Sequence, residues 1–201
     1  MTIKDRKRLD DYYSQKARKE NYPARSVWKL EEFDAKYRLF RAGQRVLDLG
    51  CAPGSWSLYA GKAVGPGGLV LGLDVAPPEA SGFPGNVIIR GADLLTDGPD
   101  LAAGYGPFQV ILSDMAPRTS GRKEIDQAKS LGLCSMALGW AKALSAPGGD
   151  FLFKIFQSPD GDGFLKEVGS YYEKQVRLKP RATRKGSQEI FVLNRGFRGE
   201  T

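Results

Sequence analysis

The sequence predicts an α/β fold in which helices cover both faces of a mostly parallel sheet. Short apolar runs alternate with helix-like segments along most of the 201 residues, a pattern typical of parallel strands joined by crossover helices. Seven runs are predicted to be strands: Arg45–Leu49, Leu69–Leu73, Val87–Ile89, Gln109–Leu112, Phe151–Ile155, Gln175–Leu178 and Glu189–Leu193. Helices are predicted between them at Trp56–Val64, Pro99–Ala103, Ile125–Leu144 and Gly163–Tyr172.

The last predicted strand is expected to run antiparallel to its neighbours. Only a short basic loop precedes it, whereas a parallel connection needs about a dozen residues or more. Two further helices are predicted before the first strand, at Arg8–Lys19 and Ala24–Arg38, with a break at Pro23. We therefore expect one domain, with a basic helical extension at residues 1–40 and a catalytic core at residues 41–195.

The composition is that of an ordinary globular protein. Apolar residues make up 41% and charged residues 26% of the chain, which argues against a disordered or fibrous protein. No apolar run approaches the roughly 20 residues needed to span a bilayer, and no apolar stretch typical of a signal peptide follows the first charges. Cys51 and Cys134 show no disulfide or metal-ligand spacing. We expect a cytoplasmic protein with reduced thiols.

The chain contains no histidine. This absence excludes Ser-His-Asp and Cys-His nucleophile systems and the commonest zinc sites. Any proton transfer must use Lys, Asp, Glu, Tyr or Cys side chains instead, and no metal is expected.

The net charge of +7 is concentrated at the two ends of the chain. Residues 1–45 hold 13 Lys/Arg and 7 Asp/Glu, and residues 174–198 hold 8 and 1. This asymmetry is compatible with a polyanion bound by the two ends and with chemistry carried out by the middle. A set of solvated surface lysines that aids solubility is the alternative, and charge alone leaves both open.

A glycine-bearing turn follows the first predicted strand and leads into a helix. The turn carries Gly50, Pro53 and Gly54, and glycines there let a ligand approach the backbone closely. The pattern is not G-x-G-x-x-G, so a dinucleotide is a poor candidate. Asp48, which we expect inside this turn, would repel a pyrophosphate but could receive the positively charged amino acid part of S-adenosylmethionine.

Acidic residues also follow the second and third predicted strands. Asp74 is placed to accept hydrogen bonds from ribose hydroxyls, and Asp93 from an adenine amino group. Trp56, early in the next helix, would line the same pocket. Each residue has a structural alternative, since either aspartate could cap a turn or helix and Trp56 could belong to the core. Their occurrence at three successive strand ends favours a nucleotide-cofactor site.

Three segments of this chain resemble the FtsJ-like RNA ribose 2′-O-methyltransferases. They are Asp48–Trp56, the string Ser113-Asp114-Met115-Ala116-Pro117, and Pro147-Gly148-Gly149 with Lys154–Gln157. The similarity extends from about Asp11 to Leu193, and it departs from the family pattern at Cys51 and Ser55. It implies a class I S-adenosylmethionine-dependent methyltransferase fold. It further implies methylation of a uridine ribose in the A-loop of 23S ribosomal RNA, within the large subunit, by a monomer.

The resemblance also implies a catalytic tetrad of Lys29, Asp114, Lys154 and Glu189. A ribose hydroxyl is a weak nucleophile, so the enzyme must align it with the methyl group and remove its proton. Lys154 is the candidate base, because burial and nearby positive charge favour a neutral amine. Asp114 would orient Lys154 and border the cofactor, while Lys29 and Glu189 would hold the ribose and its phosphate. The alternative is a set of structural ion pairs, although a lysine inside the apolar run Phe151–Phe156 needs a partner or a function.

Cations interleaved with aromatic residues flank the tetrad positions in sequence. Cations would hold phosphates, and aromatic rings could stack on splayed bases; core packing is the alternative for Tyr12, Tyr13, Tyr22 and Trp28. The candidate RNA-binding residues are Arg18, Arg25, Arg181, Arg184 and Lys185.

Three other functions remain open at the level of sequence. The chain could methylate transfer RNA or a capped RNA, or it could be a non-catalytic RNA-binding factor in ribosome assembly. A small-molecule methyltransferase would leave the basic ends without a purpose.

Overall fold

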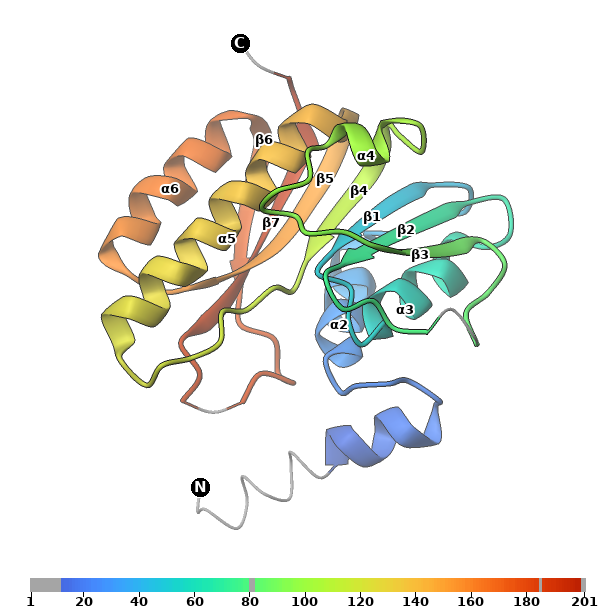
Figure 1. Cartoon of the computed structure of the whole chain (residues 1–201), viewed down its shortest axis with the longest axis horizontal. Helices are drawn as coiled ribbons and strands as arrows, with labels where there is room; N and C mark the ends of the chain where they lie inside the picture. Colours follow the sequence, from blue (N-terminus) through green and yellow to red (C-terminus); the bar gives the residue numbers. More distant parts are fainter. Residues whose placement is uncertain (1–11, 80–81, 185, 200–201) are drawn as a thin grey trace.

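The computed structural model describes residues 12–79, 82–184 and 186–199. Within them, seven strands form one sheet in the order β3-β2-β1-β4-β5-β7-β6 (Figure 1). β7 pairs antiparallel with both β5 and β6, and the other neighbours pair parallel. The predicted α/β class and the reversed last strand are confirmed. The strands are β1 Arg45–Leu49, β2 Leu69–Asp74, β3 Val87–Gly91, β4 Phe108–Ser113, β5 Ser145–Phe156, β6 Tyr172–Leu178 and β7 Glu189–Phe197.

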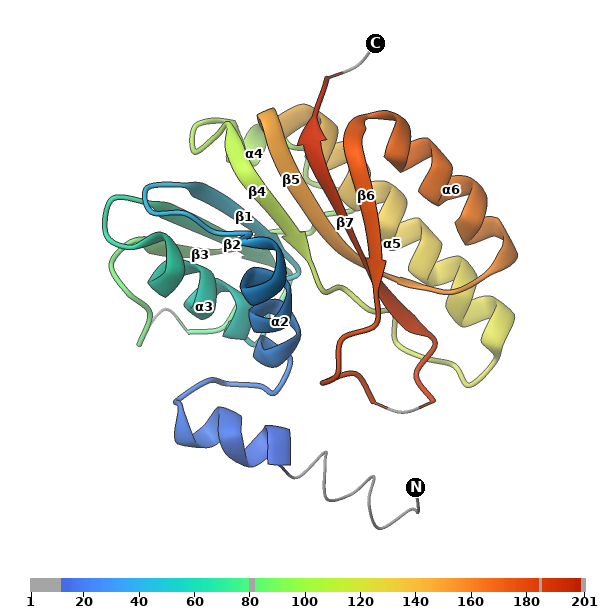
Figure 2. The ribbon, with the colours of Figure 1, turned by 180° about the vertical axis from the view of Figure 1, so that it is seen from behind.

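Helices cover both faces of the sheet (Figure 2). α2 (Val27–Tyr37) and α3 (Ser55–Val64) pack on one face, and α5 (Lys123–Leu144) and α6 (Pro159–Ser170) pack on the other, where the short α4 (Asp100–Ala103) also lies. Successive strand residues point to opposite faces. Phe151 and Phe153 of β5 therefore belong to the core under α5 and α6, while Leu152 belongs to the core under α2 and α3.

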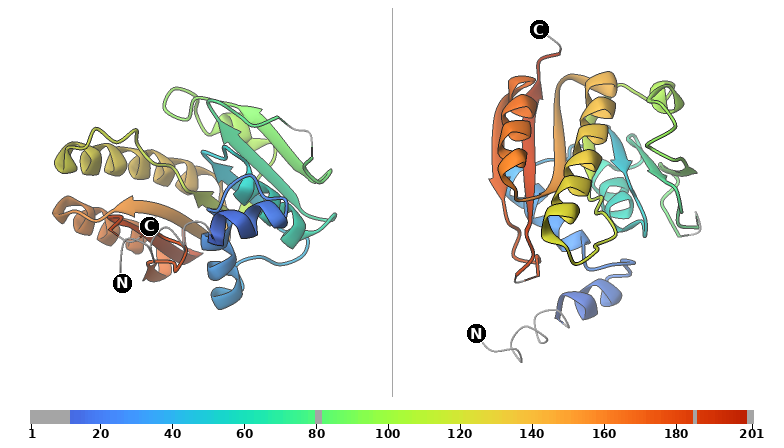
Figure 3. Two further views of the ribbon diagram at one scale, coloured as in Figure 1. Left: turned by 90° about the horizontal axis from the view of Figure 1, so that it is seen from below. Right: turned by 60° about the vertical axis from the view of Figure 1, so that its left-hand side comes forward.

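A third, smaller cluster attaches the N-terminal segment to the fold. Residues 12–19 are helical and lie next to α2 and α3 (Figure 3). Ala17 of this segment is buried with Val27 and Trp28 of α2 and with Ala182 of the loop between β6 and β7. The two basic ends of the chain are thus packed together. Of the predicted helix Arg8–Lys19, the part before residue 12 lies outside the described residues.

The predicted helix Gly163–Tyr172 is wrong at both ends. α6 begins at Pro159, because the Ser158 side chain accepts a hydrogen bond from the Gly161 amide at 3.0 Å and proline is favoured in the first helical turn. Tyr172 begins β6 and is buried against Phe151.

Other boundaries shift in the same way. α2 starts at Val27 rather than Ala24, and β5 starts at Ser145, ahead of the predicted Phe151. None of the described helices combines the length and apolar character that a membrane span requires.

The turn before α2 is attached to the start of α3. The Ala24 amide donates to the Ser55 hydroxyl at 2.7 Å, and the Trp56 indole donates to the Ser26 carbonyl at 2.9 Å. Ser55 is 1% exposed, so its hydroxyl is an acceptor that water cannot replace. This contact links the N-terminal segment to the glycine turn that precedes α3.

β1 carries a buried carboxyl group at its next-to-last residue. Asp48 is 1% exposed and accepts a hydrogen bond from the Ser57 hydroxyl at 2.6 Å. Burial raises the pKa of Asp48 to about 7, the negative charges of Asp114 and Asp74 add to that rise, and the Ser57 hydrogen bond opposes it. The folded protein therefore holds a proton on Asp48 at pH values where the unfolded chain has released it.

Replacement of Ser55 by alanine is expected to lower the free energy of unfolding by about 1–2 kcal/mol, because the Ala24 amide loses its acceptor. Urea denaturation measures this change. Ser170→Ala is the matched control, since that hydroxyl is exposed and donates to the Glu167 carbonyl within α6. Equal effects of the two substitutions would contradict the importance of the buried contact.

Replacement of Asp48 by asparagine is expected to change how stability depends on pH. Because the pKa of Asp48 is raised on folding, its stabilising contribution is full below the unfolded value of 3.8 and is lost as the pH rises through about 7. Between pH 5 and pH 8 the variant should therefore gain about 2 kcal/mol relative to the original chain. Denaturant titrations of both proteins at the two pH values measure the difference, and a constant difference would refute the buried-proton account.

Candidate active site

A cavity of about 320 Å³ lies at the carboxyl edge of the sheet. Asp74, Asp93 and Asp114 border it at the ends of β2, β3 and β4, and Gly50 borders it after β1. Ligands of open α/β sheets bind in this position. Apolar side chains that sequence reasoning did not assign form the rest of the wall. They are Ala52, Val75, Ala92, Leu94, Leu95, Met115, Ala116, Leu133 and Met136.

Backbone conformation explains the glycines of the turn. Gly50 has φ +74° and Gly54 has φ +99°, values that L side chains rarely adopt. A Cβ atom at Gly50 would collide with the Met115 side chain, and one at Gly54 would collide with the Phe83 ring. Met115 is the wall residue that the sequence could have indicated, because it directly follows Asp114 in the string Ser113–Pro117.

The acidic residues that border the cavity also hold its loops. The Asp74 carboxylate accepts from the Ala52 amide at 3.0 Å and from the Ala76 amide at 2.9 Å, and Asp93 accepts from the Leu95 amide at 3.0 Å. A carboxylate offers about four acceptor positions, so these contacts leave capacity for ligand hydroxyl or amino groups. The structural and ligand-binding roles expected for these residues are therefore compatible.

Four of the predicted cofactor residues are not among those that line the cavity. Trp56 is 3% exposed and packs against Phe191 in the core under α2 and α3. Gly54 is buried, Pro53 is exposed on the turn, and Asp48 lies buried within β1. Trp56 therefore belongs to the core, which is the structural alternative given above. Its indole N–H donates to the Ser26 carbonyl, and its ring packs against Phe191.

The tetrad residues form two ion pairs at the same edge of the sheet. The Lys154 ammonium lies 2.6 Å from Asp114 Oδ1 and 2.6 Å from the Asp114 carbonyl oxygen. The Lys29 ammonium lies 2.7 Å from Glu189 Oε1. The side chains are 6% and 19% exposed in the first pair and 12% and 14% in the second. Both pairs are therefore largely withdrawn from water.

Strand register places these pairs on one face. Lys154 lies opposite Phe191 and Phe156 lies opposite Glu189 in the antiparallel β5–β7 ladder, and directly opposed residues share a face. The Lys29 ammonium lies 5.0 Å from the centroid of the Phe191 ring. The two pairs thus flank one aromatic side chain, and Asp114 belongs both to the first pair and to the cavity wall.

This geometry suits proton removal by an amine. An ammonium group has three N–H donors, and two of those of Lys154 point to Asp114. A neutral Lys154 amine could keep both hydrogen bonds and place its lone pair at the third position. A hydroxyl group delivered to that position would meet a base whose orientation is already set.

The predicted RNA-binding residues occupy two adjoining segments. The Arg25 guanidinium donates to the Ala182 carbonyl at 2.6 Å, and the Arg181 amide donates to Glu32 at 2.8 Å. Arg18, Arg181 and Arg184 are exposed. Lys185 lies outside the described residues.

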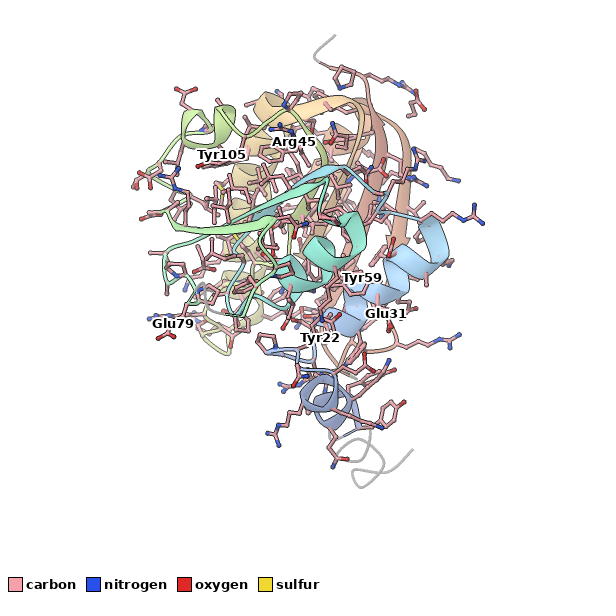
Figure 4. The ribbon with its side chains drawn as sticks, turned by 90° about the vertical axis from the view of Figure 1, so that its right-hand side faces the viewer. Tyr22, Glu31, Arg45, Tyr59, Glu79 and Tyr105 are labelled. Carbon is pink, nitrogen blue, oxygen red and sulfur yellow. The ribbon has the colours of Figure 1, made fainter. Side chains whose placement is uncertain are left out.

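The aromatic residues near these cations are mainly structural. Trp28 is 3% exposed, and the Lys16 ammonium lies 3.7 Å from its ring centroid. Tyr22 and Tyr59 approach each other where the N-terminal segment meets α3 (Figure 4), with ring centroids 6.5 Å apart. Tyr12, at 58% exposed, remains available to a ligand.

Comparisons with known proteins show which family this chain resembles. The family profile of FtsJ-like methyltransferases matches residues 22–197. A Desulfatibacillum aliphaticivorans protein named Ribosomal RNA large subunit methyltransferase E is 45% identical over 189 residues, which cover 94% of this chain and 91% of that protein. A Sorangium cellulosum protein of the same name is 45% identical over 193 residues, which cover 95% and 91%.

A solved structure supports the fold. A Plasmodium falciparum protein described as a ribosomal RNA methyltransferase superposes with a TM-score of 0.76 at 22% identity, covering 89% of this chain and 100% of that chain. The family profile extends over most of the chain, and the family expected from the sequence motifs is confirmed. The chain belongs to the FtsJ-like methyltransferase family.

Proposed function

We propose that this protein transfers a methyl group from S-adenosylmethionine to a ribose 2′-hydroxyl of large-subunit ribosomal RNA, at a uridine of the A-loop of 23S RNA. The observation that carries the proposal is the position of Asp114, which borders the cavity and also binds the Lys154 ammonium. Asp114 thereby links the proposed methyl-donor site to Lys154, the proposed general base. The names of the relatives, which specify large-subunit ribosomal RNA, support this acceptor.

The cavity residues fit the proposed methyl donor. S-adenosylmethionine supplies an electrophilic methyl group on a positively charged sulfur. Asp74 and Asp93 have acceptor capacity for hydroxyl and amino groups, and the apolar wall suits a flat base. The carboxylates of Asp74, Asp93 and Asp114 give the border of the cavity a negative potential, which favours a cationic ligand.

The chain's own residues account for the rest of the reaction. The 2′-oxygen of the ribose forms the new bond to the methyl carbon as the sulfur–carbon bond breaks, and the hydroxyl proton passes to the Lys154 amine. Asp114 holds that amine through two hydrogen bonds. The Lys29–Glu189 pair is placed to contact the ribose and its phosphate from the other side of Phe191. In this proposal residues 41–195 form the catalytic core, while residues 1–40 and the loop between β6 and β7 hold the RNA. The protein acts as a monomer in the cytoplasm.

Lys154→Ala is expected to lower the rate of methyl transfer by about 10²–10⁴-fold, the usual contribution of a positioned base. Affinity for S-adenosylmethionine, measured by calorimetry, should change little, because Lys154 does not border the cavity. Lys36→Ala, an exposed lysine of α2, is the control and should keep full activity. An undiminished rate in Lys154→Ala protein would exclude it as the base.

The acceptor is identified by supplying methyl-labelled cofactor together with large subunits, small subunits, transfer RNA or capped RNA. We expect label in large-subunit RNA, recovered after digestion as a 2′-O-methylated uridine. Label in transfer RNA or capped RNA would show that the protein methylates that RNA instead of large-subunit ribosomal RNA. Failure of the protein to bind S-adenosylmethionine would instead indicate a non-catalytic assembly factor.

A further inference from the structure

One side of α5 carries three polar side chains that contact the end of β5. Gln127, Ser130 and Cys134 are three and four positions apart, a spacing that places side chains in one stripe along a helix. Ser130 is 2% exposed and Cys134 is 3% exposed. α5 packs along β5 (Figure 1), so this polar stripe lies against that strand. The reaction proposed above uses none of the three side chains.

The contacts lie where β5 extends beyond its parallel neighbour. β4 ends at the residue that pairs with Phe153, whereas β5 continues to Phe156. Backbone groups of alternate strand residues point to the same side of a strand. The Gln157 amide donates to the Gln188 carbonyl at 3.0 Å, on the side of β7. The Lys154 carbonyl and the Phe156 amide therefore point to the opposite side, where β4 has already ended.

α5 supplies partners for both of these backbone groups. The Cys134 thiol donates to the Lys154 carbonyl with sulfur and oxygen 3.1 Å apart, and the Phe156 amide donates to the Ser130 hydroxyl at 3.0 Å. Burial raises the pKa of the Cys134 thiol to about 12, so the thiol keeps its proton and can donate it. A buried carbonyl or amide without a partner costs free energy. Two side chains of α5 thus take the place of a β4 neighbour.

Gln127 extends the polar stripe to the beginning of β7. Its side-chain amide donates to the Gln157 carbonyl at 2.5 Å and to the Gln188 side chain at 3.1 Å. Gln188 directly precedes Glu189, the partner of Lys29. The polar stripe therefore contacts the two strand ends that carry Lys154 and Glu189.

α5 approaches Lys154 from behind the active site. Leu152, two residues before Lys154, belongs to the core under α2 and α3, so the Lys154 side chain projects to that face of the sheet. α5 covers the other face and contacts only the backbone at this position. Leu133 and Met136 of the same helix border the cavity for the methyl donor. One helix therefore touches both the donor cavity and the strand that carries the proposed base.

We propose that Ser130 and Cys134 are positioning residues for Lys154, because they hold the end of β5 at the place relative to the donor cavity that methyl transfer requires. Asp114 fixes the amine of Lys154, and α5 fixes its backbone, so the residue is held at both ends. A misplacement of a reacting group by about 1 Å can lower a rate about 10²-fold. The proposal rests on the proposed function, since it takes Lys154 as the base.

Replacement of Cys134 by alanine is expected to lower the single-turnover rate of methyl transfer to large subunits about 10–10²-fold at saturating substrates. The half-saturating concentrations of S-adenosylmethionine and of large subunits should stay those of the original chain, because Cys134 does not border the donor cavity. Cys134→Ser should restore most of the rate, since a hydroxyl group can donate to the same carbonyl. Ser130→Ala should also lower the rate, because the Phe156 amide loses its acceptor.

A matched control separates positioning from a general loss of stability. Leu144, the last residue of α5, is 7% exposed and packs in the core under α5 and α6. Leu144→Ala should lower the urea midpoint of unfolding at least as much as Cys134→Ala, since it leaves a cavity in that core. Its rate of methyl transfer, measured at a temperature where all variants are folded, should equal that of the original chain.

Several outcomes would overturn the positioning role. They are a full rate in Cys134→Ala protein, an equal loss of rate in Leu144→Ala protein, a Cys134→Ser protein as slow as Cys134→Ala, and an effect confined to the half-saturating concentrations. Each of these refutes the positioning role while the original chain remains active. An original chain that methylates no RNA would instead refute the proposed function, and the positioning role with it.

Discussion

Burial of a lysine within an apolar strand is the constraint on which the active site depends. Lys154 is 6% exposed and stands between apolar neighbours in β5. Removing an ammonium from water without a partner costs several kcal/mol, so this strand is tolerable only next to an acceptor. The register that pairs Ser113 with Phe153 brings the next residues, Asp114 and Lys154, side by side. The parallel β4–β5 ladder thus stabilises the lysine and also orients it.

The reversed strand completes the arrangement. The parallel strands bring only their last residues to the carboxyl edge of the sheet. β7 runs the other way and brings its first residue, Glu189, to that edge. Glu189 then meets Lys29, which α2 carries over the same face. Phe191 lies between the two ion pairs and packs against Phe33 and Trp56. The hydrophobic core therefore extends up to the two ion pairs, which limits the access of water from that face.

The two basic ends of the chain meet through packing. The Arg25 guanidinium reaches the Ala182 carbonyl across 157 positions of sequence, and Trp28 lies buried against Ala17 and Ala182. Ser55 then attaches the turn before α2 to the helix that follows the glycine loop. The elements proposed to hold RNA and the loop that borders the donor cavity are consequently parts of one connected structure.

The sequence by itself determined the strands, the reversed last strand and the acidic residues at three strand ends, because alternation and strand termini are local properties of the chain. It also indicated Lys154, since a charge in an apolar run needs a partner. Only the tertiary structure decided that Trp56 and Trp28 belong to cores, and that Asp48 is buried within β1, outside the residues that line the cavity. Those facts depend on contacts between residues far apart in sequence, and side-chain exposure follows from such contacts rather than from local pattern.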